Sequence, residues 1–289
     1  MLRWRLIIGS LLILGVGTLA YYETRPGYMG WLVLPVSVAC VYLATDEMIA
    51  MFAARGGRPL GWVTQCANLL IVLANWLPQV RPDFARHGTF AWPMIALAVG
   101  VILAFLVEMA RYDGSGKVTE RLAMAVLPQA YVGVLFTFLI QLRLLGPVTG
   151  ILAICSLLAV VKCGDIGAYT VGRLIGRNKM VPLLSPGKTW EGFAGGVLAA
   201  CFAAWCSLAW VPTWFADGQS VEGPGWHWMV YGLLVGTTGV IGDLAESLLK
   251  RDAGVKDSSR WLPGFGGVLD ILDSILLAAP VAYLGWIWP

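Results

Sequence analysis

The sequence is short of charge for its length of 289 residues. Only 13% of the residues are Asp, Glu, Lys or Arg, about half of the roughly 25% that a soluble domain carries. This scarcity argues against an ordinary soluble domain. No block of like charge resembles a nucleic-acid-binding arm, so we expect no nucleic-acid partner.

The chain is also poor in the side chains that most often act as bases or soft metal ligands. It contains 2 histidines and 6 cysteines, and no two cysteines form a CxxC pair. No Cys/His cluster has the spacing of a zinc site. All the cysteines lie in or beside apolar runs, where a free thiol behaves as a small buried hydrophobic side chain.

Long apolar runs are what the sequence has in excess, with 58% hydrophobic residues and a mean hydropathy of +0.74. A helix that crosses a bilayer needs about 20 predominantly apolar residues. We therefore expect an all-α integral membrane protein, a single domain over 1–289, with N-terminal helices in 1–145 and the helices that carry polar motifs in 146–289. The nine expected spans are Trp4–Tyr21, Gly30–Phe52, Leu60–Leu77, Phe90–Arg111, Arg121–Leu142, Val148–Val171, Gly192–Val211, Met229–Leu249 and Val268–Ile287. Asp46 and Glu47 interrupt the second of them.

The distribution of positive charge predicts the orientation. The first run begins as a signal peptide does, but further spans follow and no convincing cleavage site appears, so we interpret it as an uncleaved helix. Of the 20 Lys and Arg, Arg25, Arg81, Arg86 and Arg143 fall after odd-numbered spans, Lys162 lies inside the sixth span, and the other fifteen share the side of the N-terminus. Loops rich in Lys and Arg remain in the cytoplasm. The side of the N-terminus is therefore expected to be cytoplasmic and the C-terminus external.

The same orientation places both histidines, His87 and His227, in external loops. Histidine base catalysis on the cytoplasmic side is therefore not expected.

Three polar segments lie at the cytoplasmic ends of the last four expected spans. The first, Lys162–Arg177, contains Asp165 within an apolar helix. An intramembrane carboxylate is a functional-site candidate by default. The glycines around it are equally consistent with close helix packing.

The second segment, Leu184–Gly196, brings Ser185, Lys188 and Thr189 together around a Ser-Pro-Gly turn. Its spacing is not that of a Walker P-loop. Its backbone and side-chain donors nevertheless suit phosphate oxygens. A re-entrant or capping turn is the structural alternative.

The third segment, Gly242–Ser274, combines acids, bases and glycines. Two polar helix faces are expected there: Asp243, Glu246, Ser247 and Lys250 at the end of the eighth span, and Asp270, Asp273 and Ser274 at the start of the ninth. Clustered carboxylates are hard ligands for Mg²⁺, and neighbouring basic residues neutralise charge in phosphoryl transfer. Buried ion pairs that stabilise packing are the alternative, although such groups are costly near a bilayer.

The three segments resemble motifs of the phosphatidate cytidylyltransferases (CDP-diacylglycerol synthases), whose last block runs S-x-x-K-R, four residues, K-D, then P-G-H-G-G and L-D-R-x-D. The matching positions are Ser247, Lys250, Arg251, Lys256, Asp257, Pro263, Gly264, Gly266, Gly267, Asp270 and Asp273. The blocks that begin at Asp165 and Ser185 also resemble the family, so the likeness covers about Lys162 to Ser274. The chain departs from the pattern at Phe265, where the family has His, and at Ile271, where it has Arg.

The resemblance implies that CTP and phosphatidic acid react to give CDP-diacylglycerol and pyrophosphate for phospholipid biosynthesis. The anionic lipid phosphate attacks the α-phosphorus of CTP, so no strong base is needed. Asp243 and Asp270 would ligate Mg²⁺ or another divalent cation, with Asp273 close by, and a monovalent cation is compatible with the site. The resemblance also implies a homodimer and a multi-pass protein of the inner (cytoplasmic) membrane, with the active site on the cytoplasmic side.

From charge, position and the resemblance together we expect the following site. The catalytic residues are Asp243, Lys250, Asp270 and Asp273. The substrate-binding residues are Asp165, Ser185, Lys188, Thr189, Ser247, Arg251, Lys256, Gly266 and Gly267.

Three other functions are compatible with parts of the sequence. One is a related cytidylyl- or phosphotransferase that acts on another lipid phosphate or a polyprenol. Another is a catalytically impaired paralogue that acts as a lipid-binding membrane protein, although the metal carboxylates remain. The third is a transporter that relays ions through Asp165 and Asp243, but such folds usually contain internal repeats and none is found here.

Overall fold

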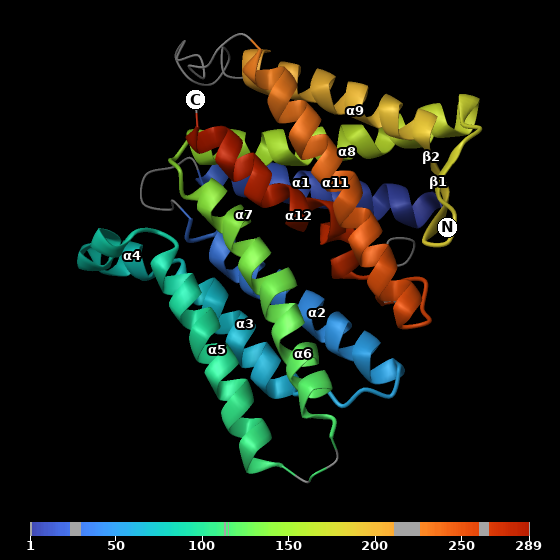
Figure 1. Cartoon of the computed structure of the whole chain (residues 1–289). Coiled ribbons are helices and arrows are strands. Elements are labelled where there is room, and N and C mark those ends of the chain that lie inside the picture. Colours follow the sequence, from blue (N-terminus) through green and yellow to red (C-terminus); the bar gives the residue numbers. More distant parts are fainter. Residues whose placement is uncertain are drawn as a thin grey trace. The chain divides into compact units, whose positions relative to one another are not determined.

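The computed structural model describes residues 2–23, 30–112, 114, 116–210, 226–259 and 266–288 (Figure 1). Most of these residues are helical, which confirms the expected all-α class. Among them, seven helical segments are long and apolar enough to cross a membrane. The seven are Val33–Ala54, Ala91–Ala110, Val118–Arg143, Thr149–Ile175, Trp190–Ala209, His227–Asp252 and Val268–Ile287.

Two of the nine expected spans are helical but are not among these seven described segments. The first expected span falls within α1 (Leu2–Glu23). The third is α3 (Gly61–Ala74), whose 14 residues extend about 21 Å at 1.5 Å per residue, less than a hydrocarbon core of roughly 30 Å. The number nine therefore stays a prediction.

The chain forms two compact units, and each combines segments that are distant in sequence. Unit 1 consists of Met1–Glu23, Gly30–Gln141 and Asp252–Ile271, and unit 2 of Thr24–Met29, Leu142–Arg251 and Leu272–Pro289. The expected division into 1–145 and 146–289 stays a prediction.

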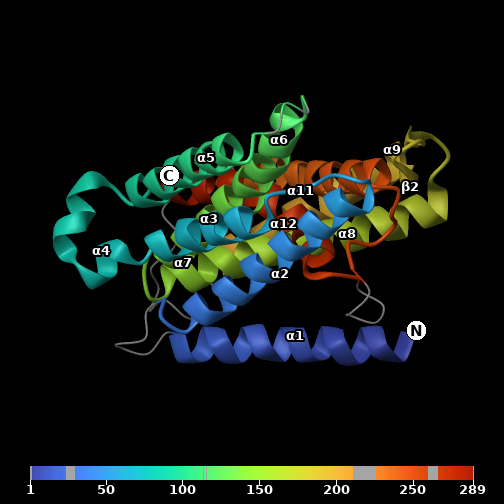
Figure 2. The ribbon, with the colours of Figure 1, turned by 90° about the horizontal axis from the view of Figure 1, so that it is seen from below.

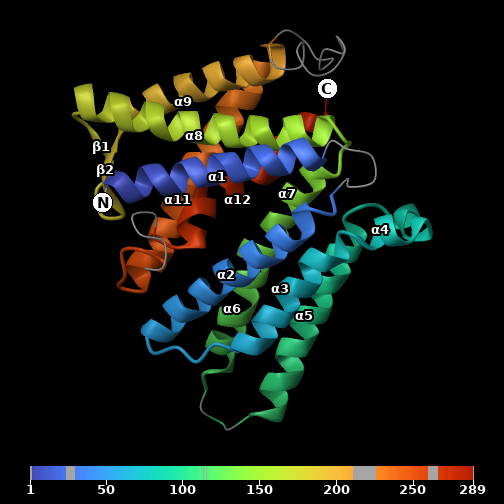
Figure 3. The same cartoon turned by 180° about the vertical axis from the view of Figure 1, so that it is seen from behind.

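Unit 1 is a helical bundle. Helices α2 (Val33–Ala54), α3 and α5 (Ala91–Ala110) pack with α6 (Val118–Pro128) and the π-helical turn η2 (Gln129–Val134), which continues into α7 (Leu135–Arg143) (Figure 3). Two short helices, α4 (Leu77–Val80) and η1 (Pro82–His87), connect α3 to α5. The core is apolar, with Val41, Met48 and Ile71 fully buried.

Several buried polar side chains of unit 1 form hydrogen bonds with one another or with the backbone, as a lipid environment requires. Asn68 Nδ2 donates to Thr45 Oγ1 at 2.8 Å and to the carbonyl oxygen of Pro128 at 3.3 Å. Gln141 Nε2 donates to Asn75 Oδ1 at 2.7 Å. Because proline disrupts the regular helical ladder, the π-helical turn that follows Pro128 accommodates the break.

Helix α1 ends beside the start of α2 (Figure 2). The carboxylate of Glu23 accepts hydrogen bonds from the backbone N–H groups of Gly30, Leu32 and Val33, at 2.6, 2.6 and 3.1 Å. The N–H groups at the start of a helix have no acceptor within that helix, so Glu23 caps α2 through Leu32 and Val33.

Unit 2 is built on the close packing of α8 (Thr149–Ile175) with α9 (Trp190–Trp205), which continues as η3 (Cys206–Trp210). A Cβ on Gly167 would meet Ala199 and the carbonyl oxygen of Gly195, and one on Gly196 would meet Ala168. The small residues of the first polar segment therefore serve helix packing.

A hairpin of β1 (Lys179–Val181) and β2 (Ser185–Thr189) connects α8 to α9. Helix α11 (His227–Asp252) belongs to unit 2 as far as Arg251, and α12 (Val268–Ile287) belongs to it from Leu272 onward. The hairpin was not foreseen, because the segment was expected only to turn.

Candidate functional site

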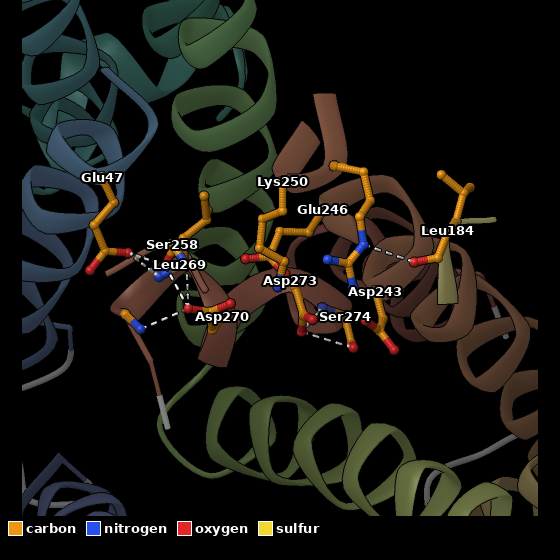
Figure 4. A network of polar contacts seen from close by, with 12 residues as sticks. Glu47, Leu184, Asp243, Glu246, Lys250, Ser258, Leu269, Asp270, Asp273 and Ser274 are labelled. Atoms are coloured by element: carbon orange, nitrogen blue, oxygen red, sulfur yellow. Dashed lines mark hydrogen bonds and ion pairs between the residues drawn. The ribbon is translucent and has the colours of Figure 1, made fainter. Parts of the chain in front are cut away.

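Three carboxylates from two helices of unit 2 come together (Figure 4). Asp243 and Glu246 lie on α11 and Asp273 on α12, and one oxygen of each lies within 4.8 Å of the others. Glu246 is fully buried and Asp273 is 8% exposed. We call these three residues the acidic cluster. They are hard oxygen donors, the ligands that Mg²⁺ prefers.

Glycines of α11 permit this approach. A Cβ on Gly242 would collide with the backbone of Asp273 and lie 2.9 Å from the Cα atom of Ser274. Ser274 Oγ donates to Asp273 Oδ1 at 2.9 Å. The local sequence thus allows α11 and α12 to approach closely enough for their carboxylates to meet.

Two lysines neutralise part of this negative charge. Lys188 Nζ, from strand β2, lies 2.7 Å from Asp243 Oδ2 and donates to the carbonyl oxygen of Val240 at 3.4 Å. Lys250 forms an ion pair with Glu246 one turn earlier on α11. Arg251 Nε instead donates to the carbonyl oxygen of Leu184 in the hairpin, at 3.3 Å (Figure 4). The hairpin therefore brings the second polar segment to the third.

The other expected site residues of unit 2 lie on α8, on strand β2 and on α11. Asp165 pairs with Lys162 at 3.3 Å on α8. Thr189 is 4% exposed, and its Oγ1 accepts from the N–H of Gly192 at 3.1 Å. Thr189 is therefore the N-cap of α9, as the capping alternative stated. Ser185 begins β2, and Ser247 follows Glu246 on α11. Their roles in substrate binding stay predictions.

Asp270 belongs to unit 1 and has different neighbours from the acidic cluster. Its Oδ2 atom accepts hydrogen bonds from the backbone N–H of Ser258 at 2.9 Å, from Ser258 Oγ at 2.7 Å and from the N–H of Gly267 at 2.7 Å. Gly266 has a φ of +91°. The expected ligand pair of Asp243 and Asp270 stays a prediction, as does phosphate binding by the two glycines.

Three further expectations concern the loop before α12 and the first turn of that helix. Lys256 is exposed, and its role in substrate binding stays a prediction. Phe265 lies outside the described residues, together with Pro263 and Gly264. Ile271 is half-buried in the first turn of α12.

Sequence reasoning missed Glu47 as part of this region. Glu47 lies on α2 and accepts hydrogen bonds from Ser258 and from the start of α12. A signal was present, because Glu47 is a carboxylate inside an expected span and such residues are functional candidates. It was interpreted only as an interruption. Glu246 was placed on the polar face of α11 but was not proposed as a site residue.

Comparisons with known proteins extend the likeness to almost the whole chain. A sequence model of the cytidylyltransferase family matches residues 3–287. The phosphatidate cytidylyltransferase of Synechocystis sp. is 30% identical over 284 residues, which cover 88% of each chain. That of Bacillus subtilis is 34% identical over 219 residues, 75% of this chain and 76% of the other. That of Chlamydia pneumoniae is 31% identical over 258 residues, 86% of this chain and 80% of the other. The protein is therefore a member of the cytidylyltransferase family.

Proposed function

We propose that this membrane nucleotidyltransferase is a CTP:phosphatidate cytidylyltransferase, which makes CDP-diacylglycerol and pyrophosphate for phospholipid biosynthesis. The names of the curated relatives support the substrates. The observation that carries the chemistry is the acidic cluster, with two lysines paired to its carboxylates. Carboxylates beside lysines suit a reaction between two phosphate groups.

The acidic cluster fits a divalent cation such as Mg²⁺. Its ligand atoms are all carboxylate oxygens, and three carboxylates face two lysines, so the group carries an excess of negative charge. When bound, the cation supplies charge neutralisation at the oxygens of a polyphosphate. We assign its binding to Asp243 and Asp273, with Glu246 beside them. The resemblance also makes Asp270 a ligand, and that assignment needs its own test.

In this proposal Lys188 and Lys250 bind the phosphates of CTP. Each is held by a carboxylate of the cluster and so directs its ammonium group to the place where polyphosphate would bind. An oxygen of the lipid phosphate attacks the α-phosphorus. The bond from that phosphorus to the bridging oxygen breaks, and pyrophosphate leaves with the electron pair. The attacking oxygen is already anionic, so no residue has to remove a proton from it.

Three finer proposals accompany this function. The distribution of Lys and Arg supports a cytoplasmic active site in the inner membrane. A homodimer and a monovalent cation rest on the resemblance alone.

A second candidate is a related transfer to another lipid phosphate. The observation that favours it is Ile271, a half-buried apolar side chain where the family pattern has arginine. With isoleucine in place of arginine, the site has one positively charged side chain fewer for binding anions.

The test is pyrophosphate release by the purified protein from labelled CTP. We expect release only when both phosphatidic acid and Mg²⁺ are present, and none from the Asp243→Asn variant. Release with a different lipid phosphate but not with phosphatidic acid would establish the second candidate. Absence of turnover across a panel of lipid phosphates would refute the enzymatic function altogether.

A further inference from the structure

Glu47 lies inside α2, which is long and apolar enough to cross a membrane, but accepts hydrogen bonds from groups more than 200 residues later in the chain (Figure 4). Its Oε1 atom accepts from the N–H of Val268 at 2.9 Å, and its Oε2 atom from the N–H of Leu269 at 2.8 Å. The side chain is 6% exposed. These donors begin α12, where the first turn of a helix has no internal acceptors and carries partial positive charge.

Ser258 connects Glu47 to Asp270. Its Oγ atom lies 2.9 Å from Glu47 Oε2 and 2.7 Å from Asp270 Oδ2. A hydroxyl has one proton, so it donates to one carboxylate at a time. Asp270 is the third residue of α12 and also accepts from the N–H of Gly267, the residue before the helix. This contact is one half of a capping box, the bond from the N–H before the helix to the side chain of its third residue.

The two glycines before α12 are explained by these contacts. A Cβ on Gly267 would overlap Ser258 Oγ and both carboxylate oxygens of Glu47. A Cβ on Gly266 would overlap Asp270 Oδ2, and its φ of +91° is a conformation that other residues rarely adopt. The pair leaves space for the two carboxylates. We call Glu47, Ser258, Gly267 and Asp270 the Glu47 network.

We propose that Glu47 is a positioning residue of the transferase reaction. It fixes the rotation of α12 at Val268 and Leu269. Because the backbone of a helical turn has a regular geometry, that rotation also sets the direction of Asp270, which lies in the same unit. This inference rests on the proposed function, since it assumes that the carboxylates of α12 serve the transfer. It gives α2, which carries none of the family's motifs, a part in the site.

The test compares Glu47→Gln with a matched control, Glu23→Gln. Both wild-type carboxylates are buried in unit 1 and both cap the first turn of an apolar helix. They differ in the helix that they cap. Glu23 accepts from the start of α2 and Glu47 from the start of α12. A purely structural role predicts similar losses of thermal stability and activity in both variants.

We expect Glu47→Gln to lower kcat by about 10- to 100-fold, the usual effect of residues that orient metal-binding side chains. The KM for CTP should change less than about threefold, because CTP does not contact Glu47 in this proposal. Glu23→Gln should retain kcat within about twofold. Equal losses of kcat in the two folded variants, or a wild-type kcat in Glu47→Gln, would overturn the proposal.

Ser258→Ala provides a second variant if Glu47→Gln does not fold. It removes the hydroxyl between the two carboxylates but keeps the backbone donors. We expect a smaller fall in kcat, of about 3- to 10-fold, at an unchanged KM for CTP. An unchanged kcat in this variant would contradict the proposal.

A readout that needs no turnover separates this inference from the proposed function. Mg²⁺ alone should raise the Tm of the wild type and of Glu23→Gln, and raise that of Glu47→Gln much less. If the wild type turns over no lipid phosphate but the Tm responses differ in this way, the proposed function fails and the positioning role stands. Equal Tm responses in all three proteins refute the positioning role.

Discussion

The carboxylates of the Glu47 network and those of the acidic cluster have different partners, although both groups include residues of α12. Asp270 and Glu47 accept hydrogen bonds from backbone N–H groups and from one hydroxyl. In the acidic cluster, Asp243, Glu246 and Asp273 lie against one another and against two lysines. The first group is surrounded by donors, and the second combines like charges.

The difference indicates distinct tasks. N–H donors stabilise a carboxylate and in turn hold the backbone that carries them, so the Glu47 network fixes the start of a helix. Like charges within 4.8 Å repel, and a cation relieves that repulsion. The acidic cluster is therefore the better candidate for metal binding, and the Glu47 network for positioning.

The largest expected effect comes from two substitutions on α12. Asp273→Asn and Asp270→Asn should each lower pyrophosphate release by about 100- to 1000-fold, the range for losing one strong electrostatic interaction at a reacting centre. Their stabilities should change in opposite directions. Without metal, Asp273→Asn relieves repulsion and should raise the Tm, whereas Asp270→Asn loses charged hydrogen bonds worth about 1–3 kcal/mol and should lower it.

The measurement is thermal unfolding in a chelator, with steady-state kinetics beside it. Conversion of Asp270 or Asp273 to alanine is a less suitable control, because it also removes the oxygen that accepts from Gly267 or Ser274. A rise in Tm for Asp270→Asn would mean that the wild-type carboxylate is destabilised by neighbouring negative charge. The contrast between the Glu47 network and the acidic cluster would then fail. A near-wild-type rate for the same variant would remove Asp270 from the site.

Lys188, which pairs with Asp243, gives a test of the charge beside the acidic cluster. Replacing it with methionine keeps most of the apolar stem but removes the charge that lies 2.7 Å from Asp243 Oδ2. We expect the KM for CTP to rise about tenfold, equivalent to about 1.4 kcal/mol, and Lys188→Arg to retain most of the affinity. If KM is unchanged and only stability falls, Lys188 is a structural partner of Asp243.

Periodicity and composition predicted the parts of this structure that depend on neighbouring residues. Apolar runs predicted helices, and helical spacing placed Asp243 and Glu246 on one face of α11, where the structure has them. Local sequence also contained the glycines that allow α11 and α12 to pack, although their partners could not be identified from one chain.

The contacts that depend on distant residues could not be predicted. Nothing near Glu47 in sequence indicates that its carboxylate accepts from Val268, because the two residues meet only through the packing of the whole unit. The glycines of the last motif are interpreted as space for phosphate, which stays a prediction, and the sequence did not indicate that Gly267 also faces Glu47. The hydroxyl of Thr189 caps α9, and its expected role in substrate binding stays a prediction. In each case the local pattern drew attention to the residue but did not identify its partner.

Ile271 tests whether a departure from the family pattern affects the site. Its half-buried position in the first turn of α12 leaves part of the side chain in contact with solvent or lipid. We expect Ile271→Arg to raise the turnover of phosphatidic acid a few-fold, because it restores a cation between Asp270 and Asp273 in sequence. Phe265→His restores the other departure and should add to the gain. A fall in turnover for both would show that the pocket has repacked around the apolar residues.

The smallest effect is expected at Arg55, which offers a control for every charge substitution above. Arg55 pairs with Asp252 in unit 1, but the two side chains are 58% and 66% exposed. Exposed ion pairs contribute about 0–1 kcal/mol, because water and salt screen them. Arg55→Ala should therefore leave kcat unchanged and shift the Tm by no more than a few degrees. A loss of activity comparable to that of Glu47→Gln would mean that any charge removed from unit 1 disturbs catalysis, and the distinction between the Glu47 network and an ordinary surface pair would fail.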